Sequence, residues 1–292
     1  MEINQGKLAR DMLIRRLGNF GLLLSPIVSY FFLWAPIVVL IVFSFNDAAS
    51  VSVWRGFTFK WYQQIFAAGS GDASFVTEKL LEALGNSLFV SLTASLLATT
   101  IGTMLAIAIH RGNFPGRRII DGLLYVPVVI PEITQGVSLA IFFRIIFEYV
   151  QTMTGQRLTP GFATIIIAHV AFNISYVVIV VRARLATMNT NYEEAARDLG
   201  ANNFQTFWRI TFPLLLPGIL AGGLLALTLS LDDFVVTFFT KGVGDDTLPI
   251  FVYGMLKQRV SPEINAISTL MILASTVLIG FSLILQQRGT ND

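Results

Sequence analysis

Long apolar runs alternate with shorter polar segments along the whole chain. A helix that crosses a membrane needs about 20 mostly apolar residues, and six runs reach that length. Backbone N–H and C=O groups find no water in hydrocarbon, so each run is expected to be helical. Continuous rather than alternating apolar character disfavours a β-barrel. The pattern predicts an all-α, polytopic membrane protein with six transmembrane helices: Phe20–Phe45, Asn86–His110, Ile119–Phe147, Gly161–Val181, Phe212–Thr240 and Glu263–Leu285.

Prolines interrupt two of these runs, at Pro127 and Pro131 in the third and at Pro213 and Pro217 in the fifth. A proline inside a helix removes a backbone hydrogen bond and bends the helix. Such bends are tolerated in a membrane where the freed carbonyls face protein or a water-filled cavity. Both interrupted spans are therefore expected to line a pathway.

Small residues indicate where helices approach closely. The second run is rich in Ser, Thr, Ala and Gly, and Gly218 and Gly222 form a small-xxx-small pair in the fifth. Packing rather than hydrophobicity drives helix association in lipid, so both features predict tight helix contacts. No internal repeat is evident in the sequence, which disfavours a self-contained secondary carrier.

Four ionisable residues lie inside the apolar runs: Glu132, Arg144, Asp232 and Asp233. Such groups are costly in a membrane and are usually functional or paired. Glu132 either begins a helix that restarts after Pro131, where the helix dipole favours an acid, or serves as a pathway acid for a cationic solute. Adjacent aspartates on a continuous helix point about 100° apart, so Asp232 and Asp233 are not expected to face one cavity. We expect one of them to accept from backbone or to pair with Arg144, and the other to face the solute.

Composition agrees with the membrane assignment. Apolar residues make up 54% of the 292-residue chain and charged residues 13%, against about 25% in soluble proteins, and the mean hydropathy is +0.69. A net charge of +2 without a basic stripe gives no indication of nucleic-acid binding. The absence of cysteine excludes disulfides, thiolate zinc sites and cysteine nucleophiles.

The sequence contains no motif that would support catalysis. There is no GxxxxGK[ST] phosphate loop, no GxSxG elbow, and the two histidines, His110 and His169, have no metal-ligand spacing. We expect His169, which lies in the fourth run, to hydrogen-bond a neighbouring helix rather than to bind a metal. No catalytic or metal-binding residue is predicted, and a membrane-embedded enzyme is the weakest of the functional alternatives.

The distribution of Lys and Arg predicts the orientation. With six spans both termini lie on one side, which carries 12 of the 20 basic residues, against 7 in the longer loops of the other side. Cytoplasmic segments are enriched in Lys and Arg, so the termini are expected to be cytoplasmic. Residues 1–19 are interpreted as a cytoplasmic N-terminal segment and residues 20–292 as the transmembrane domain.

The segment between the fourth and fifth runs, residues 190–218, is polar and is predicted to form two short helices. Thr190 and Asn191 each precede a glutamate by three positions, Glu193 and Glu194, which gives two overlapping capping-box patterns, and Gly200 is typical of a helix end. Asn202 or Asn203 is expected to cap a second helix. Apolar side chains at helical spacing give each helix one apolar face: Tyr192, Ala195, Ala196 and Leu199 in the first, Phe204, Phe207 and Trp208 in the second.

This segment is expected to project from the membrane as a knob. A helix resting on lipid is the alternative, but an acidic helix with small alanines in place of large anchors is poorly suited to anionic lipid. Such a face suits a groove in another protein.

The spacing of Glu194-Ala195-Ala196, Gly200, Ile210 and Pro213 resembles the EAA signature of permease subunits of binding-protein-dependent ABC importers. Six spans with this loop between the fourth and fifth also match that family. Phe212 departs from the pattern, because many members have leucine before the proline, and it is expected to alter packing only.

The resemblance implies a type I permease fold in which residues of about 186–212 form the coupling loop. It implies a bacterial inner-membrane location, and partners comprising a homologous permease, two ATP-binding subunits and an extracytoplasmic solute-binding protein. ATP and Mg²⁺ would be bound by the partner subunits, with no cofactor in this chain, which is then not an enzyme. The residues implied in coupling are Glu193, Glu194, Ala195, Ala196, Asp198, Gly200 and Pro213.

Within that family, "LSLDDFVVTFFT" and "SPEINAISTL" resemble the second permease of spermidine/putrescine importers. A small cationic solute would explain the acids Glu132, Asp232 and Asp233, which are then interpreted as substrate-pathway residues. A permease for an opine, another amine or iron stays open, as does a proton-coupled secondary carrier from a different class.

Overall fold

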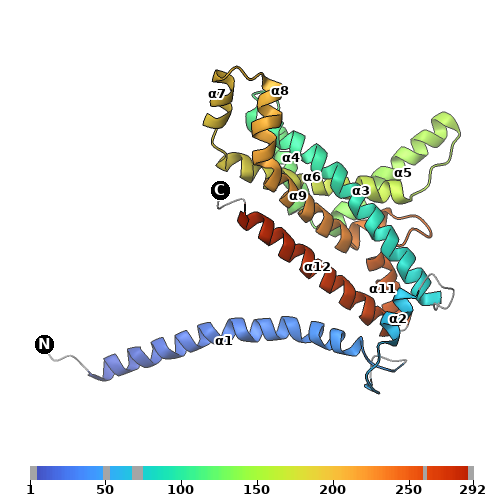
Figure 1. Cartoon of the computed structure of the whole chain (residues 1–292). Coiled ribbons are helices and arrows are strands. Elements are labelled where there is room, and N and C mark those ends of the chain that lie inside the picture. Colours follow the sequence, from blue (N-terminus) through green and yellow to red (C-terminus); the bar gives the residue numbers. More distant parts are fainter. Residues whose placement is uncertain (1–4, 49–52, 68–74, 259–261, 289–292) are drawn as a thin grey trace. The chain divides into compact units, whose positions relative to one another are not determined.

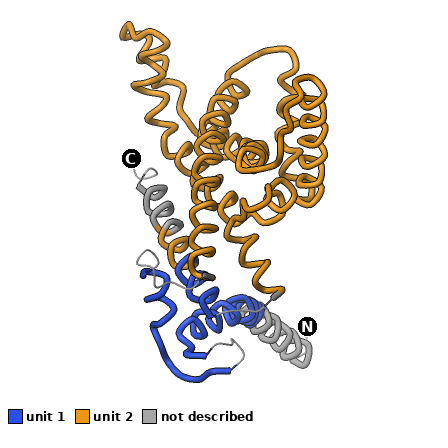
Figure 2. Tube along the Cα trace, turned by 90° about the vertical axis from the view of Figure 1, so that its right-hand side faces the viewer, with its two compact units in different colours: residues 1–72, 260–271 blue, residues 73–259, 272–292 orange. Residues whose placement is uncertain are grey.

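The structure is a computed structural model that describes residues 5–48, 53–67, 75–258 and 262–288. These residues are almost entirely helical, and among them the only β pairing is an isolated bridge between Asn46 and Phe57. The chain divides into two compact units, residues 1–72 with 260–271 and residues 73–259 with 272–292 (Figure 2). Each unit is described by itself.

The first unit contains α1 (Gln5–Phe43) and the short helix α2 (Lys60–Phe66). Asn46 joins the two, because its side chain accepts from the Arg55 backbone at 2.9 Å and donates to Val53 O at 2.8 Å, while its carbonyl accepts from Trp61 Nε1 at 2.8 Å. The span Leu24–Phe43 within α1 buries none of its most apolar window, as a lipid-facing helix would.

Three long helices form the core of the second unit: α3 (Phe75–Arg111), α6 (Phe162–Thr187) and α9 (Phe212–Asp232) (Figure 1). Glycines permit their close approach, as the small-residue pattern predicts. A Cβ on Gly102 would lie 2.8 Å from Val177 Cβ, and one on Gly218 would lie 2.7 Å from Arg184 Cβ. Gly222 approaches the same helix, since a Cβ at this position would lie only 3.5 Å from the Val177 backbone.

Five helices in the described part of the chain are long and apolar enough to cross a membrane, and shorter apolar helices accompany them. They overlap the first five predicted spans. The sixth predicted span lies within α12 (Pro262–Arg288). α3 begins at Phe75, before the start of the predicted apolar run at Asn86, because the first turns of the helix are polar. Its Ser87 Oγ accepts from the Leu248 backbone at 2.8 Å and thereby fixes the start of α11 (Leu248–Gln258).

The third and fifth spans are both interrupted, the third at Pro131 as predicted but not at Pro127, which lies inside a helix. α4 (Arg117–Val129) and α5 (Glu132–Thr154) are separated at Pro131. The fifth span breaks elsewhere: α9 runs through Pro217 and ends at Asp232, and α10 (Val235–Thr240) follows.

The expectation that the prolines interrupt the fifth span is therefore wrong. Pro213 directly follows the π-helical turn Phe207–Thr211, and the backbone stays helical across it. Pro217 lies inside α9, where Arg184 Nε donates to the nearby Leu214 O at 3.0 Å. Both prolines are accommodated within continuous helix.

The polar segment forms α7 (Asn191–Asp198), α8 (Asn203–Thr206) and a π-helical turn, η1 (Phe207–Thr211), which leads directly into α9. Figure 1 shows α7 and α8 at the end of the unit where α9 begins, beyond the core helices. The domain boundary at residue 19 stays a prediction, since α1 runs through that position without a break.

Candidate functional site

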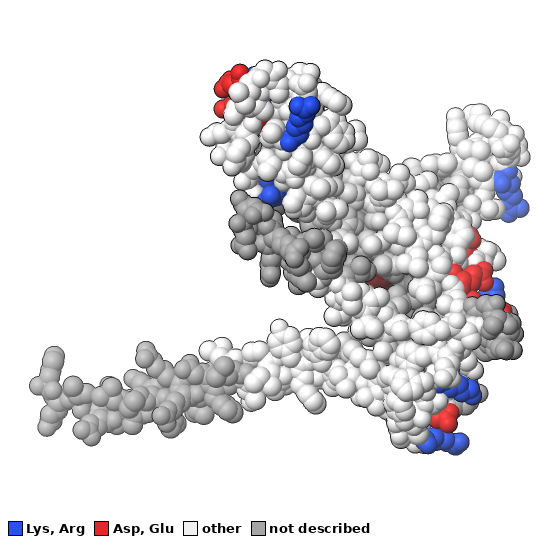
Figure 3. All heavy atoms as spheres, viewed as in Figure 1, with Lys and Arg blue, Asp and Glu red and all other residues white. Residues whose placement is uncertain are grey.

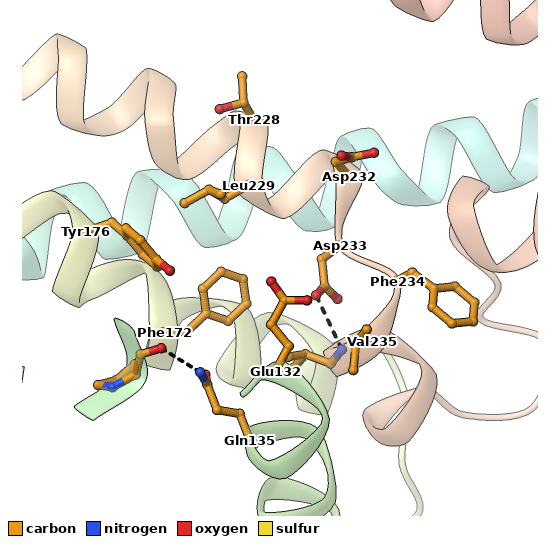
Figure 4. Close-up of a pocket in the computed structure, with 12 residues that line it drawn as sticks. Glu132, Gln135, Phe172, Tyr176, Thr228, Leu229, Asp232, Asp233, Phe234 and Val235 are labelled. Carbon is orange, nitrogen blue, oxygen red and sulfur yellow. Dashed lines mark hydrogen bonds between the residues drawn. The ribbon is translucent and has the colours of Figure 1, made fainter. Parts of the chain in front are cut away.

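The two interrupted spans meet at a cavity of about 360 Å³. α5 and α6 line one side of it and the α9–α10 break lines the other, as Figure 4 shows. All three acids that the sequence indicates for a substrate pathway lie on its wall. The side chains that matter most for its chemistry are Glu132, Gln135, Phe172, Tyr176, Asp232 and Asp233.

Gln135 stabilises the break in the third span. Pro131 has no N–H to donate to Pro127 O, and Gln135 Nε2 donates to that carbonyl at 2.6 Å and to Ile130 O at 2.9 Å. The restarted helix α5 has Glu132 as its first residue, where the helix dipole favours a carboxylate. Glu132 is exposed, and no donor or cation pairs with it among the described residues.

Asp233 closes the break in the fifth span. Its carboxylate accepts from the Thr237 N–H at 2.8 Å and from Thr237 Oγ1 at 2.7 Å, and only 7% of its side chain is exposed. These contacts satisfy free N–H groups at the start of α10. The expectation that one of the two aspartates accepts from backbone is confirmed. Arg144, the alternative partner, pairs instead with Glu148 at 2.9 Å on the exposed face of α5.

His169 holds the two halves of the fifth span to α6. It is fully buried, with Nδ1 2.6 Å from Ser230 Oγ on α9 and Nε2 2.9 Å from Thr237 Oγ1 on α10. Nε2 also lies 3.2 Å from the Asp233 carboxylate. The expectation that His169 bonds a neighbouring helix is confirmed. Sequence reasoning missed Ser230 and Thr237, although both are hydroxyl residues within a turn or so of the aspartate pair.

Asp232 is exposed, and among the described residues it has no hydrogen-bond or ion-pair partner. Both aspartates line the cavity, so the expectation that adjacent acids cannot face one cavity is wrong. That expectation assumed a continuous helix. α9 ends at Asp232 and Asp233 has extended backbone (φ −66°, ψ 122°), so the spacing of a continuous helix does not hold between the two residues and both line the cavity.

The arrangement suits a positively charged ligand. Glu132 and Asp232 present carboxylates without partners, and the rings of Phe172 and Tyr176 line the same cavity. Aromatic faces attract cations as well as packing on apolar stems. No group of three His, Cys, Asp or Glu placed to hold a metal ion occurs in the described ranges.

The second candidate region is the segment of residues 186–212 before α9, which the sequence resemblance implies in coupling. The apolar face predicted for α7 is largely exposed, with Tyr192 at 58% and Leu199 at 90%. On the adjoining turn Phe204 is 72% exposed. Figure 3 shows acidic side chains gathered over α7, where Glu194 and Asp198 are exposed. Ala196 is half-buried, but most of the residues implied in coupling lie at the surface: Glu194, Ala195, Asp198, Gly200 and Pro213.

Gly200 ends α7 as predicted. Its φ of +89° is a conformation that favours glycine, and its N–H donates to Arg197 O at 2.8 Å while Ala201 N donates to Ala196 O at 3.0 Å. These paired bonds satisfy the last carbonyls of the helix and fix the sharp turn into α8.

The capping predictions have mixed outcomes. The boxes at Thr190 and Asn191 are wrong: Thr190 makes no side-chain cap, and Asn189 Oδ1 accepts from Asn191 N at 3.0 Å instead. Glu193 is drawn into the protein by other partners and cannot close a box. The cap of α8 by Asn202 is confirmed, with Asn202 Oδ1 accepting from Gln205 N at 2.8 Å and Gln205 Oε1 accepting from Asn202 N at 3.1 Å.

Comparison with known proteins identifies the family. Residues 98–289 match the model of the "Binding-protein-dependent transport system inner membrane component" family, which is more than half of the chain. The chain belongs to this family. It is therefore a multi-pass inner-membrane transport component rather than an enzyme.

Two curated permeases are similar to this chain over most of their length. The chain is 36% identical over 256 residues to the putrescine transport system permease protein PotI of Escherichia coli K12, covering 87% of this chain and 86% of PotI. It is 33% identical over 264 residues to the spermidine/putrescine transport system permease protein PotC of Haemophilus influenzae, covering 90% and 95%.

Among solved structures, a bacterial ABC transporter involved in import of the acidic polysaccharide alginate shares the fold. The TM-score is 0.69 with 19% identity, over 98% of this chain and 99% of that one. A bacterial alginate ABC transporter in complex with an alginate pentasaccharide-bound periplasmic protein gives a TM-score of 0.66 with 19% identity, over 97% and 96%. The resemblance to a type I ABC permease fold is confirmed.

Proposed function

We propose that this chain forms half of the translocation pathway of an ATP-driven importer for a small cationic solute of the diamine or polyamine class. The cavity carries the proposal, because Glu132 and Asp232 line it without partners at the junction of two interrupted helices. The printed names of PotI and PotC, putrescine and spermidine/putrescine permeases, support the same solute class.

A diamine matches this wall chemically. Two unpaired carboxylates inside a membrane protein are costly, and ammonium groups that meet them recover part of that cost. The methylene stem between the ammonium groups would pack on the rings of Phe172 and Tyr176. An anionic solute would meet like charge at both acids, which is a strong basis for rejection.

The mechanism requires partners. An extracytoplasmic binding protein delivers the solute, a homologous permease supplies the other half of the pathway, and two ATP-binding subunits bind ATP and Mg²⁺, with no cofactor in this chain. The termini and α7 lie on the cytoplasmic side. The exposed face of α7, with Tyr192 and Leu199, docks into a groove of an ATP-binding subunit, since an amphipathic helix commonly binds in this way.

Movement of the ATP-binding subunits displaces the coupling loop, and α9 carries that displacement toward the cavity. α8 and η1 lead without a break into α9, whose far end is Asp232. The cavity therefore lies at the opposite end of the helix that starts at the coupling loop. Alternate opening of the cavity to the two sides follows from rearrangement of the half-helices around it.

Uptake of radiolabelled putrescine and spermidine into vesicles that contain the assembled transporter tests the proposal. Asp232→Asn and Glu132→Gln should each lower the apparent affinity by about tenfold or more, since a hydrogen bond to a charged group is worth roughly 1.5–3 kcal/mol. Glu148→Gln is the matched control, because it removes a carboxylate from the exposed pair with Arg144 and should leave uptake unchanged.

If neither change at the cavity alters uptake of any amine, these acids are structural. Competition by opines and by iron in the same vesicles decides between solute classes. Inhibition by one of these, without inhibition by amines, would replace the polyamine assignment and leave the permease assignment standing.

A further inference from the structure

Glu193 and Glu194 are neighbours on α7 with opposite surroundings. Glu194 is exposed with the apolar docking face, whereas Glu193 is 7% exposed and turned into the protein. A buried carboxylate must be paired or it is strongly destabilising. The partners of Glu193 therefore indicate what this residue does.

Three separate elements meet at the Glu193 carboxylate. Arg111, the last residue of α3, donates to Glu193 Oε1 and forms an ion pair with it. Thr211 Oγ1, at the end of the π-helical turn that precedes α9, donates to the same oxygen at 2.5 Å. Arg197, one turn further along α7, lies 4.0 Å from the second oxygen.

The polar links between α7 and the bundle converge on Glu193. In the described ranges, every side-chain hydrogen bond or ion pair between α7 and another helix ends on Glu193. The helix has eight residues, its apolar face is exposed, and it is bounded by a turn at Gly200. α7 also packs against α8 and η1, so a force on α7 can reach α9 by that packing as well, whereas its printed polar link to α3 is this carboxylate.

We propose that Glu193 is the positioning residue that locks α7 to the C-terminal end of α3 and to the start of α9, so that the three move as one body. This inference rests on the proposed function of α7 as the docking helix. The lock, defined as Glu193, Arg111 and Thr211, stays closed through the transport cycle, because opening it would leave a buried charge without a partner. Through it, a displacement of α7 reaches two of the three core helices at once.

Covalent replacement of the lock tests this role. The chain contains no cysteine, so Arg111→Cys combined with Glu193→Cys creates the only reactive pair. The complete transporter, with its ATP-binding subunits and binding protein, is reconstituted in proteoliposomes, and solute taken up per ATP hydrolysed is measured. The double variant should assemble and hydrolyse ATP but lose about tenfold or more in uptake per ATP. A bis-methanethiosulfonate linker between the two cysteines should restore uptake per ATP. Reduction of the linker's disulfides should not prevent ATP hydrolysis.

Unchanged uptake per ATP without the linker, or failure of the linker to restore it, would overturn the proposal. Arg144→Cys with Glu148→Cys is the matched control, since it removes an ion pair on the exposed face of α5 and should change nothing with or without the linker. Glu193→Gln keeps the size of the side chain and one acceptor oxygen but removes the charge that pairs with Arg111. It should give a smaller loss, and it serves if the cysteine pair does not assemble.

A distance measurement separates this inference from the identity of the solute. Spin labels at Asn191→Cys on α7 and Met104→Cys on α3, both exposed positions, report the separation of the two helices by double electron–electron resonance. With ATP-binding subunits present, ATP and vanadate should leave the distance unchanged in the otherwise native chain and should change it when Glu193→Gln is added. A change in the otherwise native chain would show that the lock opens. Absence of amine uptake with this result intact would count against the proposed solute alone.

Discussion

At the scale of single residues, burial separates acids that hold the structure from acids left available for a ligand. The side chains of Asp233 and Glu193 are buried and accept hydrogen bonds, whereas Asp232, Glu132 and Glu194 are exposed. In both adjacent pairs, one acid anchors an element and the other faces outward. The sequence identifies all five as noteworthy, but it does not indicate which acid meets His169 or Arg111, because these two partners lie on helices distant in the chain.

The histidine predicted to bond a neighbouring helix provides a stability test at this scale. His169→Ala would leave Ser230, Thr237 and Asp233 without their buried partner, and should lower the free energy of unfolding by about 3 kcal/mol. Thermal unfolding of the purified protein in detergent measures the loss.

His110→Ala is the matched control for that change, because His110 is exposed at the C-terminal end of α3 and should shift the unfolding midpoint little. Equal midpoints for the two variants would show that His169 does not hold the broken span together.

At the scale of elements, apolar runs and EAA spacing predict most of the helices and the turn at Gly200 correctly. The breaks are predicted less well. Proline marks the break before α5, but the break after α9 falls at an aspartate that caps the next half-helix. A proline indicates only where a backbone hydrogen bond is lost locally. This break instead depends on the contacts of Asp233 with His169 and Thr237. The missed caps have the same cause, since Glu193 has stronger partners outside α7.

Close helix packing makes a prediction at the same scale. Gly218→Val would place side-chain atoms where a Cβ alone already meets Arg184 Cβ at 2.7 Å, so overpacking should cost about 1–3 kcal/mol and reduce the amount of protein in the membrane. Quantitative immunoblotting of membranes and thermal unfolding measure both effects.

Gly122 on α4 supplies the comparison for the packing change, because a Cβ there meets nothing within 4 Å. Gly122→Ala should leave membrane levels and unfolding unchanged. A Gly218 variant that behaves the same way would contradict the close contact of α6 and α9.

At the scale of the whole molecule, six apolar runs and one polar loop are enough to predict the fold class and the family, both of which are confirmed. The cavity could not be predicted in shape, because it forms where segments near residues 132, 172 and 232 converge. The cavity and the segment that contains α7 lie at opposite ends of α9, so the proposed mechanism is that ATP-driven displacement at one end of this helix opens a pathway for a cation at the other.

Uptake of labelled putrescine by proteoliposomes, measured for this chain alone and for the complete set of partner subunits, tests this mechanism. We expect ATP-dependent uptake from the complete complex only. We also expect that Glu194→Lys abolishes both uptake and solute-stimulated ATP hydrolysis while the chain stays in the membrane, because the charge reversal lies on the exposed docking side of α7. Uptake by this chain alone, driven by a proton gradient without ATP, or full stimulation in the Glu194→Lys complex, would contradict the mechanism.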